Sequence, residues 1–329
     1  MSVAFPESLQ IIDDFAFSVC ASLQDVKLSD GLQTLGKYAF HSCSSLQSVA
    51  LPAKLQTFVL GAFAVCRSLA SVNFPPGLQQ IGVQAFRGSA LTTVAFPVGL
   101  RTIGAGAFIH CYSLTSIAIP DSVENIDLGA FAYCSSLTSV KLPKVLKSVG
   151  GFFGCKSLTS TEIPDGVETV LETAFACCYA LTTVKQPNGL QTIADRAFLY
   201  YRSLTSIAFP NGLRHIGDEA FKECESLTSV ALPNGLQSIA AKAFNRCYAL
   251  NFVAFPDTLQ IVGQEAFNDC PTLTLTELPD GLQTVGRNAF GYLGERDDRR
   301  RVPDFTLRGA PGSVAEEYAR KNKFRFEPR

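Results

Sequence analysis

The feature that most constrains this chain is a short motif that recurs in a fixed register along almost its whole length. The stretch LTSIAIPDSVENIDLGAFAYCSS, residues 114–136, reappears with small changes from end to end, and prolines form a second column with the same period. Two columns in one register identify a tandem-repeat protein, whose units stack on their neighbours. The phenylalanine of this motif recurs every 22 or 23 residues and defines thirteen units, anchored at Phe17, Phe40, Phe63, Phe86, Phe108, Phe131, Phe153, Phe175, Phe198, Phe221, Phe244, Phe267 and Phe290.

Each unit divides into three segments with different local preferences. The segment L-T-S-V-A-L-P alternates apolar and polar residues, which predicts a short strand that the proline ends. A turn such as P-N-G follows, and then a second extended piece, G-L-Q-T-I-G. In the last segment, x-x-A-F-x-x-C-x-S-L, the apolar residues fall at roughly helical spacing, so we expect one turn of α- or 3₁₀-helix. The unit shortens around GGFFGCKS, where we expect a local irregularity.

The same residues carry a resemblance to a known family. The pattern L-x-x-I-x-[LIF]-P-x-x-L-x-x-I-G-x-x-A-F-x-x-C-x-S, seen from Leu114 onward, resembles the 23-residue leucine-rich repeats of the BspA-like (Treponema-type) class over about nine tenths of the chain. The resemblance implies a right-handed solenoid of about 13 units, with a parallel concave β-sheet, short convex strands and helical turns. It also implies a binding role, because members of that family are mostly surface or extracellular binding and adhesion proteins.

Three regions are expected along the chain: the leucine-rich repeat solenoid at 1–293, a charged insertion at 294–304 and a C-terminal cap at 305–329. The cap sequence predicts a strand, a short helix and a strand. Ser313 and Glu316 have the spacing of a capping box, and Val314, Tyr318 and Ala319 are expected to face the last coil. The insertion is expected to be a solvated loop; the alternative is a docking site for an anionic partner, formed by Arg299, Arg300 and Arg301.

Composition and residue spacing exclude several classes of function. The formal net charge is −1 and no apolar run is long enough to span a bilayer, so we expect neither nucleic-acid binding nor a membrane span. Three histidines, at 41, 110 and 215, lie at least three units apart and cannot share a metal or a catalytic triad. No phosphate-binding loop precedes a helix. We therefore expect a non-enzymatic chain without cofactor or metal.

The cysteines follow the repeat. Of the eleven, nine occupy one column three residues after the phenylalanine, and Cys155 and Cys177 fall outside it. This regularity predicts buried thiols with occasional disulfides as the alternative. Many thiols, no visible signal peptide and no N-x-S/T acceptor site favour a reducing compartment. The family resemblance implies the cell surface instead, so the sequence leaves the compartment open.

Function is expected where units depart from the pattern. On the strand face, Lys141, Glu162 and Lys185 interrupt a row of small hydroxyl and alanine residues, which otherwise reads as a self-satisfied structural row. A second candidate is the rim, the position that follows the cysteine column. Tyrosine and arginine anchor many interfaces, and the rim candidates are Tyr112, Tyr179, Arg202 and Tyr248, with Tyr200 and Tyr201 beside them.

These observations predict a non-enzymatic protein-protein interaction scaffold, with surface recognition or adhesion as the leading role. A protein is the expected partner, and a glycan is the other class considered. The alternative is a structural subunit of a larger assembly. That reading depends on the first coil, where apolar residues such as Phe5, Ile12 and Phe17 lie at an uncapped end and offer a surface for docking or self-association.

Overall fold

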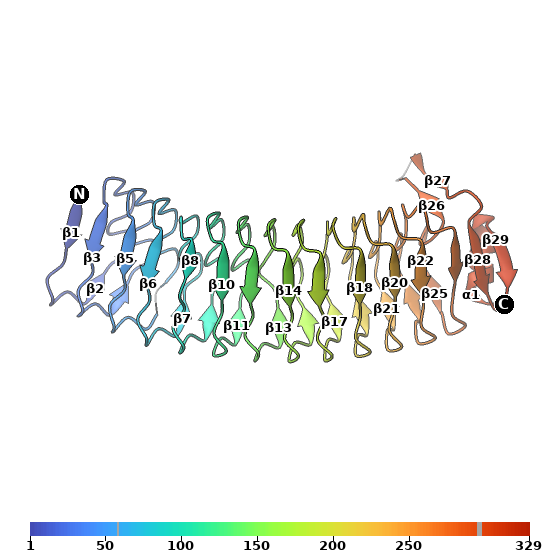
Figure 1. Ribbon diagram of the computed structural model, residues 1–329, viewed down its shortest axis with the longest axis horizontal. Helices are drawn as coiled ribbons and strands as arrows, with labels where there is room; N and C mark the ends of the chain where they lie inside the picture. The colour runs from blue at the N-terminus through green and yellow to red at the C-terminus, as the bar shows by residue number, and fades with distance from the viewer. Residues whose placement is uncertain (58, 295–297) are drawn as a thin grey trace. The chain divides into compact units, whose positions relative to one another are not determined.

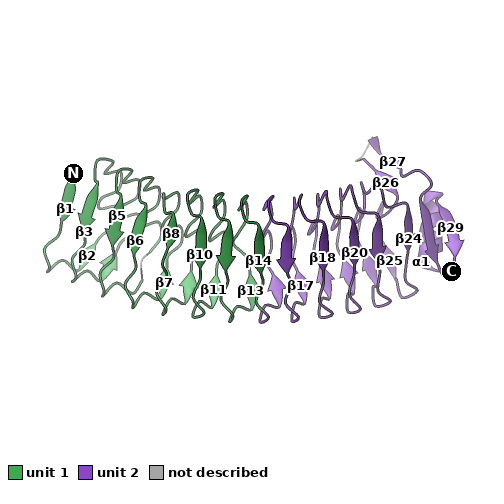
Figure 2. Ribbon diagram, viewed as in Figure 1, with its two compact units in different colours: residues 1–164 green, residues 165–329 purple. Residues whose placement is uncertain are grey.

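The structure is a computed structural model that describes residues 1–57, 59–294 and 298–329. The chain divides into two units, Met1–Pro164 and Asp165–Arg329, which are shown in green and purple in Figure 2. Each unit is a solenoid of short parallel strands. Every coil has three sides, which we call the first-strand face, the second-strand face and the turn face, in chain order.

The first-strand face of the first unit is built from strands of two or three residues that end just before the proline turn. They lie side by side in Figure 1, and most pair in parallel with a neighbour, for example β10 with β12. The strands of this face are β1 (Ser2–Ala4), β3 (Asp25–Lys27), β5 (Ser48–Ala50), β6 (Ser71–Asn73), β8 (Thr93–Val94), β10 (Ser116–Ala118), β12 (Ser139–Lys141) and β14 (Ser160–Glu162).

The second-strand face of the first unit carries two-residue strands after each proline turn. Isoleucine, leucine or valine at the second position points inward and is buried, while the first position is mostly exposed. The strands are β2 (Ile11–Ile12), β4 (Thr34–Leu35), β7 (Gln80–Ile81), β9 (Thr102–Ile103), β11 (Asn125–Ile126) and β13 (Ser148–Val149).

The second unit repeats this plan and adds the C-terminal elements. Its first-strand face holds β16 (Thr183–Lys185), β18 (Ser206–Ala208), β20 (Ser229–Ala231), β22 (Phe252–Ala254), β24 (Leu275–Glu277), β28 (Thr306–Gly309) and β29 (Arg325–Pro328). Its second-strand face holds β15 (Thr169–Val170), β17 (Thr192–Ile193), β19 (His215–Ile216), β21 (Ser238–Ile239), β23 (Ile261–Val262) and β25 (Thr284–Val285). A hairpin of β26 (Tyr292–Leu293) and β27 (Arg300–Arg301) projects from the turn face.

The strand register places equivalent positions of successive coils beside each other. Val26 lies opposite Val49, and Val49 lies opposite Val72, so each apolar position becomes a continuous column inside the coil. A single coil could not bury these side chains alone, because the coils on either side of it cover them. The expected repeat solenoid with parallel strands is therefore confirmed.

The turn face is not helical, which corrects the expected helical turns. Its backbone instead alternates two kinds of hydrogen bond. Phe40 N–H donates to the carbonyl of Ala62 in the next coil at 2.9 Å, whereas Ala39 N–H donates back to Gly36 within the same coil at 3.3 Å. Most turns also hold two left-handed residues, such as Tyr38 and Ser42 with φ of 54° and 58°. Donation between coils satisfies the N–H groups that a helix would have used internally.

The phenylalanines form a stack inside each unit, and this stack corrects one anchor of the repeat. Phe131 stacks on Phe108 with ring centroids 5.3 Å apart, and on Phe152 at 5.5 Å. Phe152 is fully buried, whereas Phe153 is half-buried and contacts the edge of Tyr133. The column residue is therefore Phe152. The sequence is ambiguous there because two phenylalanines are adjacent in the shortened unit.

The same correction moves Cys155 into the cysteine column, three residues after Phe152. Its thiol donates to the carbonyl of Phe131 at 3.3 Å, as Cys66 donates to Phe40 at 3.0 Å and Cys111 to Phe86 at 3.2 Å. Every cysteine is a free thiol. Burial raises the pKa of Cys111 to about 11, so this thiol stays protonated at neutral pH. The column thus acts as a row of small buried donors rather than as a set of disulfides.

Burial predicts which thiols react in the native chain. Cys20 is exposed and Cys177 is half-buried, whereas the other nine are buried. We expect iodoacetamide at about pH 8 to alkylate Cys20 first and Cys177 more slowly, because alkylation needs an accessible thiolate. Peptide mapping by mass spectrometry measures this, and the denatured chain, where all thiols should react, is the control. Alkylation of native Cys111 at the rate of Cys20 would contradict the buried column.

The C-terminal cap consists of β28, α1 (Val314–Asn322) and β29, as expected. Tyr318 on α1 is buried, and its hydroxyl both donates to the carbonyl of Phe290 and accepts its N–H, each at 3.1 Å. The expected capping box does not form, because the Ser313 side chain makes no cap hydrogen bond and Glu316 instead accepts the Gly312 N–H at 2.6 Å. Glu317 and Lys321 form an i,i+4 ion pair of 2.6 Å.

Candidate functional site

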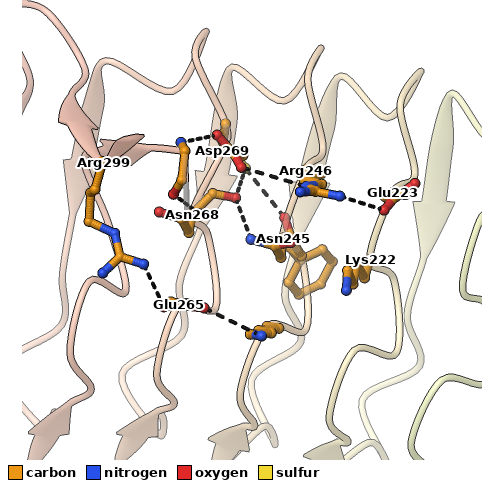
Figure 3. A network of polar contacts seen from close by, with 12 residues as sticks. Lys222, Glu223, Asn245, Arg246, Glu265, Asn268, Asp269 and Arg299 are labelled. Atoms are coloured by element: carbon orange, nitrogen blue, oxygen red, sulfur yellow. Dashed lines mark hydrogen bonds and ion pairs between the residues drawn. The ribbon is translucent and has the colours of Figure 1, made fainter. Parts of the chain in front are cut away.

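The turn face of the second unit holds a network of paired charges. Glu265 is almost buried and faces two cations, with Arg299 Nη2 at 2.7 Å and Lys242 Nζ at 3.6 Å. Figure 3 shows the contact between Glu265 and Arg299. Arg299 comes from the expected insertion, so this insertion is anchored to the coils by a charged side chain whose exposed fraction is only 16%. Residues 295–297 of the insertion lie outside the described part of the chain.

Hydrogen bonds to the backbone at Gly294 strengthen this anchorage. Asp269 accepts the Gly294 N–H at 2.5 Å, and the buried amide of Asn268 donates to the Gly294 carbonyl at 3.2 Å. Asp269 also lies 3.6 Å from Arg246, which in turn donates to Glu223 at 3.1 Å. The charges of this face therefore neutralise one another within the unit.

The insertion arginines thus differ in what they can offer to an anionic partner. Arg299 already pairs with Glu265, whereas Arg300 and Arg301 on β27 are exposed. The guanidinium of Arg301 lies over the ring of Phe324, 5.9 Å from its centroid. A docking role for the insertion can therefore use Arg300 and Arg301, and it remains a prediction.

The rim of the second unit presents a pre-arranged row of side chains. Arg202 lies over the ring of Tyr179, 5.8 Å from its centroid, and pairs with Glu225 at 3.1 Å. Glu225 occupies the rim of the next coil, and Tyr248 occupies the rim of the coil after it, with 44% of its surface exposed. A cation over a ring and an ion pair both restrict rotamers, so these side chains lose little entropy when they bind.

Two other tyrosines of the predicted set are less accessible. Tyr200 is half-buried with a left-handed φ of 63°. Tyr201 is fully buried in the cysteine column, where its ring meets Phe198 edge-on at 5.5 Å. Tyr201 is therefore a core residue and not a contact for a partner. The signal was in the sequence, because Tyr201 occupies the position three residues after Phe198 that cysteine fills elsewhere.

The first-strand face carries mainly small side chains around its predicted site. Lys141 ends β12 and Glu162 ends β14, and both are exposed; their neighbours on this face are mainly serine, threonine and alanine. Lys185 is exposed at the corresponding position of β16 in the second unit. Threonines beside this face bond to the preceding coil, as Thr138 Oγ1 does to the Thr115 carbonyl at 3.0 Å. Small side chains already satisfied in this way offer few anchors.

The turn face of the first unit has the opposite character from that of the second. Tyr112, at the rim, is 56% exposed, and its hydroxyl lies 2.9 Å from Nδ1 of His110. The His110 ring stacks on Tyr133 with centroids 4.8 Å apart. Partial burial and then the nearby Arg87 guanidinium lower the pKa of His110 below its usual value, which favours the neutral imidazole at neutral pH.

The first coil, which was predicted to offer an apolar surface, can also be described. The predicted residues are not the exposed ones, because Ile12 is buried and Phe5 and Phe17 are half-buried against each other, with ring centroids 5.3 Å apart. The first coil instead exposes other apolar side chains, with Ile11 56%, Phe15 58% and Val19 67% exposed. Its use in docking or self-association stays a prediction. Within the described residues, no three His, Cys, Asp or Glu side chains are grouped so as to hold a metal ion, and no helix has the length and apolarity needed to cross a membrane.

Stacked parallel strands, proline turns and inward columns of leucine, isoleucine and phenylalanine define a leucine-rich repeat solenoid. The model of the BspA type leucine rich repeat region matches residues 1–115, 61–182, 101–218 and 195–295, and these matches together cover most of the chain. The chain belongs to this family. Proteins with this repeat are generally non-enzymatic binding scaffolds, and no catalytic family is indicated. No curated protein sequence matches the chain.

Solved structures agree with this fold. A leucine-rich repeat protein from Bacteroides ovatus is 24% identical, with a TM-score of 0.59 over 87% of this chain and 91% of that one. A leucine-rich repeat protein from Eubacterium ventriosum is 22% identical, with a TM-score of 0.55 over 82% of each chain. At this level of identity the likeness concerns the fold alone.

Proposed function

We propose that this chain is a non-enzymatic recognition scaffold that binds a protein partner through its rim. The observation that supports this most directly is the row formed by Tyr179, Arg202 and Tyr248, which are exposed at equivalent positions of one unit. Exposed aromatic and arginine side chains dominate the energetics of many interfaces. They also stand out here, because the recurring residues of each coil are committed to strand, turn or core.

The first-strand face supports recognition less well. Its outward side chains are small, as Ser116 and Ala118 on β10 illustrate, and a flat surface of this kind offers no pocket or anchor. Lys141, Glu162 and Lys185 could add a few polar contacts there, but exposed charges usually contribute little binding energy. Surface recognition or adhesion fits a rim that can contact a partner along several coils.

The rim is tested with peptide ligands selected on the chain itself. Peptides from a random phage-displayed library are selected on the native protein, and their affinities are then measured for the triple variant Tyr179→Ala, Arg202→Ala and Tyr248→Ala. We expect affinity to fall at least about tenfold, because each anchor contributes on the order of 1 kcal/mol or more. The melting temperature should change little, since all three side chains are exposed.

A matched control replaces three exposed side chains of the first-strand face, Ser206→Ala, Ser229→Ala and Lys185→Ala, which lie in the same unit. This variant should keep the affinity of the native chain within about twofold. Peptides that bind the rim variant as tightly as the native chain, but lose affinity for the control variant, would place recognition on the strand face and contradict the proposal.

A further inference from the structure

The first unit contains a long stretch without acidic residues. Residues 31–120 include no Asp or Glu, although they include Lys37, Lys54, Arg67, Arg87 and Arg101. The whole chain is nearly neutral, so this stretch concentrates positive charge in a few neighbouring coils. A surface with local charge of one sign attracts ligands of the opposite sign.

A groove on the turn face of this unit gathers part of that charge. A hollow of about 450 Å³ is lined by Arg67, Arg87, His110 and Tyr112 together with Val65. Both arginine side chains are exposed, and among the described residues no carboxylate lies within ion-pair distance of either one. The volume lies within the range of ordinary ligand sites. The groove therefore offers two guanidinium groups whose hydrogen-bond donors are available.

A second hollow extends the groove across neighbouring coils. It measures about 280 Å³ and shares Val65 and Arg87 with the first. Its lining includes Phe15 and Tyr38, whose rings stack 5.4 Å apart. Because the two hollows share these two lining residues, they lie next to each other, and we call the pair the groove. Arg87 lines both parts, and aromatic rings line each of them.

The second unit shows that the same turn positions can hold paired charges. Glu219 there accepts from Arg196 at 2.8 Å and from Lys222 at 3.1 Å, and Lys222 occupies the position that Arg87 occupies in the first unit, directly after the column phenylalanine. Arg67 and Arg87 in the first unit have no such acidic partner among the described residues, although Arg101 pairs with Glu124 there. The missing negative charge is thus expected from a ligand.

We propose that this groove binds an acidic peptide segment of a partner protein, with carboxylates on Arg67 and Arg87 and apolar side chains against Val65, Tyr38 and Tyr112. This inference rests on the proposed function, because Arg67 and Tyr112 are rim residues of the first unit. Guanidinium groups bind carboxylates through two parallel hydrogen bonds, which gives both strength and orientation.

A peptide suits the groove better than an acidic saccharide. Saccharide hydroxyl groups need partners that accept as well as donate; the groove has no carboxylate, although it has neutral side chains such as Gln84 and Ser113 that can do both. The two guanidinium groups only donate, so they match carboxylates better than hydroxyl groups. Val65 and the faces of Phe15 and Tyr38 instead match apolar side chains.

The test uses a fluorescent peptide of alternating acidic and apolar residues, made of Glu, Asp, Phe and Leu, and anisotropy as the readout on the full chain. We expect micromolar binding that weakens as NaCl is raised from about 50 to about 500 mM. A peptide with Gln and Asn in place of Glu and Asp should bind at least about tenfold more weakly. The double variant Arg67→Ala, Arg87→Ala should lose affinity for the acidic peptide to the same extent.

The matched control is Lys54→Ala, Lys144→Ala, which removes the same charge from the same unit at exposed positions outside the groove. It should bind within about twofold of the native chain, because charges beyond a Debye length are screened. Equal losses in both double variants would mean general charge attraction and overturn the assignment, as would no binding of the acidic peptide. Tighter binding of a sulfated or uronic acid oligosaccharide would also overturn it.

Failure of this inference and failure of the proposed function remain distinguishable. The rim variant at 179, 202 and 248 alters the second unit only, while the groove variant at 67 and 87 alters the first. If library-selected peptides lose affinity for the rim variant while the acidic peptide binds the groove variant as tightly as the native chain, the rim proposal stands and the groove proposal is wrong. The reverse pattern supports the groove and contradicts the rim residues of the second unit.

Discussion

Replacing Phe152 by alanine is expected to lower the free energy of unfolding by about 3–5 kcal/mol, whereas Phe153→Ala should cost only about 1 kcal/mol. The two residues are adjacent and chemically identical, but they differ in burial. Phe152 is fully buried and stacks on Phe131 with an interplanar angle of 7°, so its loss leaves a cavity in the phenylalanine column. Phe153 is half-buried and touches Tyr133 at the edge.

Urea denaturation of the two variants, followed by circular dichroism, measures the difference. A solenoid is stabilised by contacts between neighbouring coils and need not unfold in a single step, so the midpoints of the same transition should be compared. Phe131→Ala serves as a reference for a regular column position, because Phe131 is fully buried between two rings. If Phe153→Ala shifted the midpoint as much as Phe131→Ala and Phe152→Ala did not, the column would pass through Phe153 after all.

This pair of residues also shows how far the repeat pattern alone specifies the fold. In a regular repeat, the spacing of the residues is enough to assign the strand, the proline turn and the buried column, because every inward position recurs on the next coil. The shortened unit has two adjacent phenylalanines, and spacing alone assigns the wrong one. In Figure 1 the coils follow one another regularly through the first unit, yet the local choice between Phe152 and Phe153 depends on packing.

The turn face shows a second limit of pattern reasoning. Ala, Phe, Cys and Leu recur at roughly helical spacing, which predicted a helical turn. The backbone instead donates hydrogen bonds to the next coil, as Phe40 does to Ala62. A local pattern of residues cannot show a hydrogen-bond partner that lies one coil further along the chain. The cost of left-handed residues such as Tyr38 is offset by these bonds between coils.

The candidate sites were predicted only where a single column departed from the repeat. The rim residues Tyr179, Arg202 and Tyr248 share one position, so the column reveals them. The groove was missed because Arg67, Arg87 and His110 occupy three different positions of three coils and meet only in the folded chain. One signal was nevertheless available in the sequence, namely the absence of Asp and Glu from residues 31–120.

The largest electrostatic effect is expected at the anchorage of the insertion. Arg299 and Glu265 are separated by 34 residues, yet their side chains lie 2.7 Å apart and are only 16% and 10% exposed. Arg299→Ala should lower the free energy of unfolding by about 2–3 kcal/mol, because it leaves a nearly buried carboxylate with one remaining cation, Lys242. In the Arg299→Ala variant, adding Glu265→Gln should lower the free energy of unfolding much less than Glu265→Gln does in the native chain, because the Arg299 charge that Glu265 would leave unpaired is already gone.

A double-mutant cycle measures this coupling, and the chain supplies a matched control. Arg101 and Glu124 lie 2.6 Å apart, but their side chains are 61% and 57% exposed. The cycle should give about 2 kcal/mol for Arg299 with Glu265 and less than about 1 kcal/mol for Arg101 with Glu124, because water and mobile ions screen the exposed pair. Equal coupling energies would show that burial does not strengthen the anchorage. Since the two distances are nearly equal, any difference between the cycles reports the environment of the charges and not their separation.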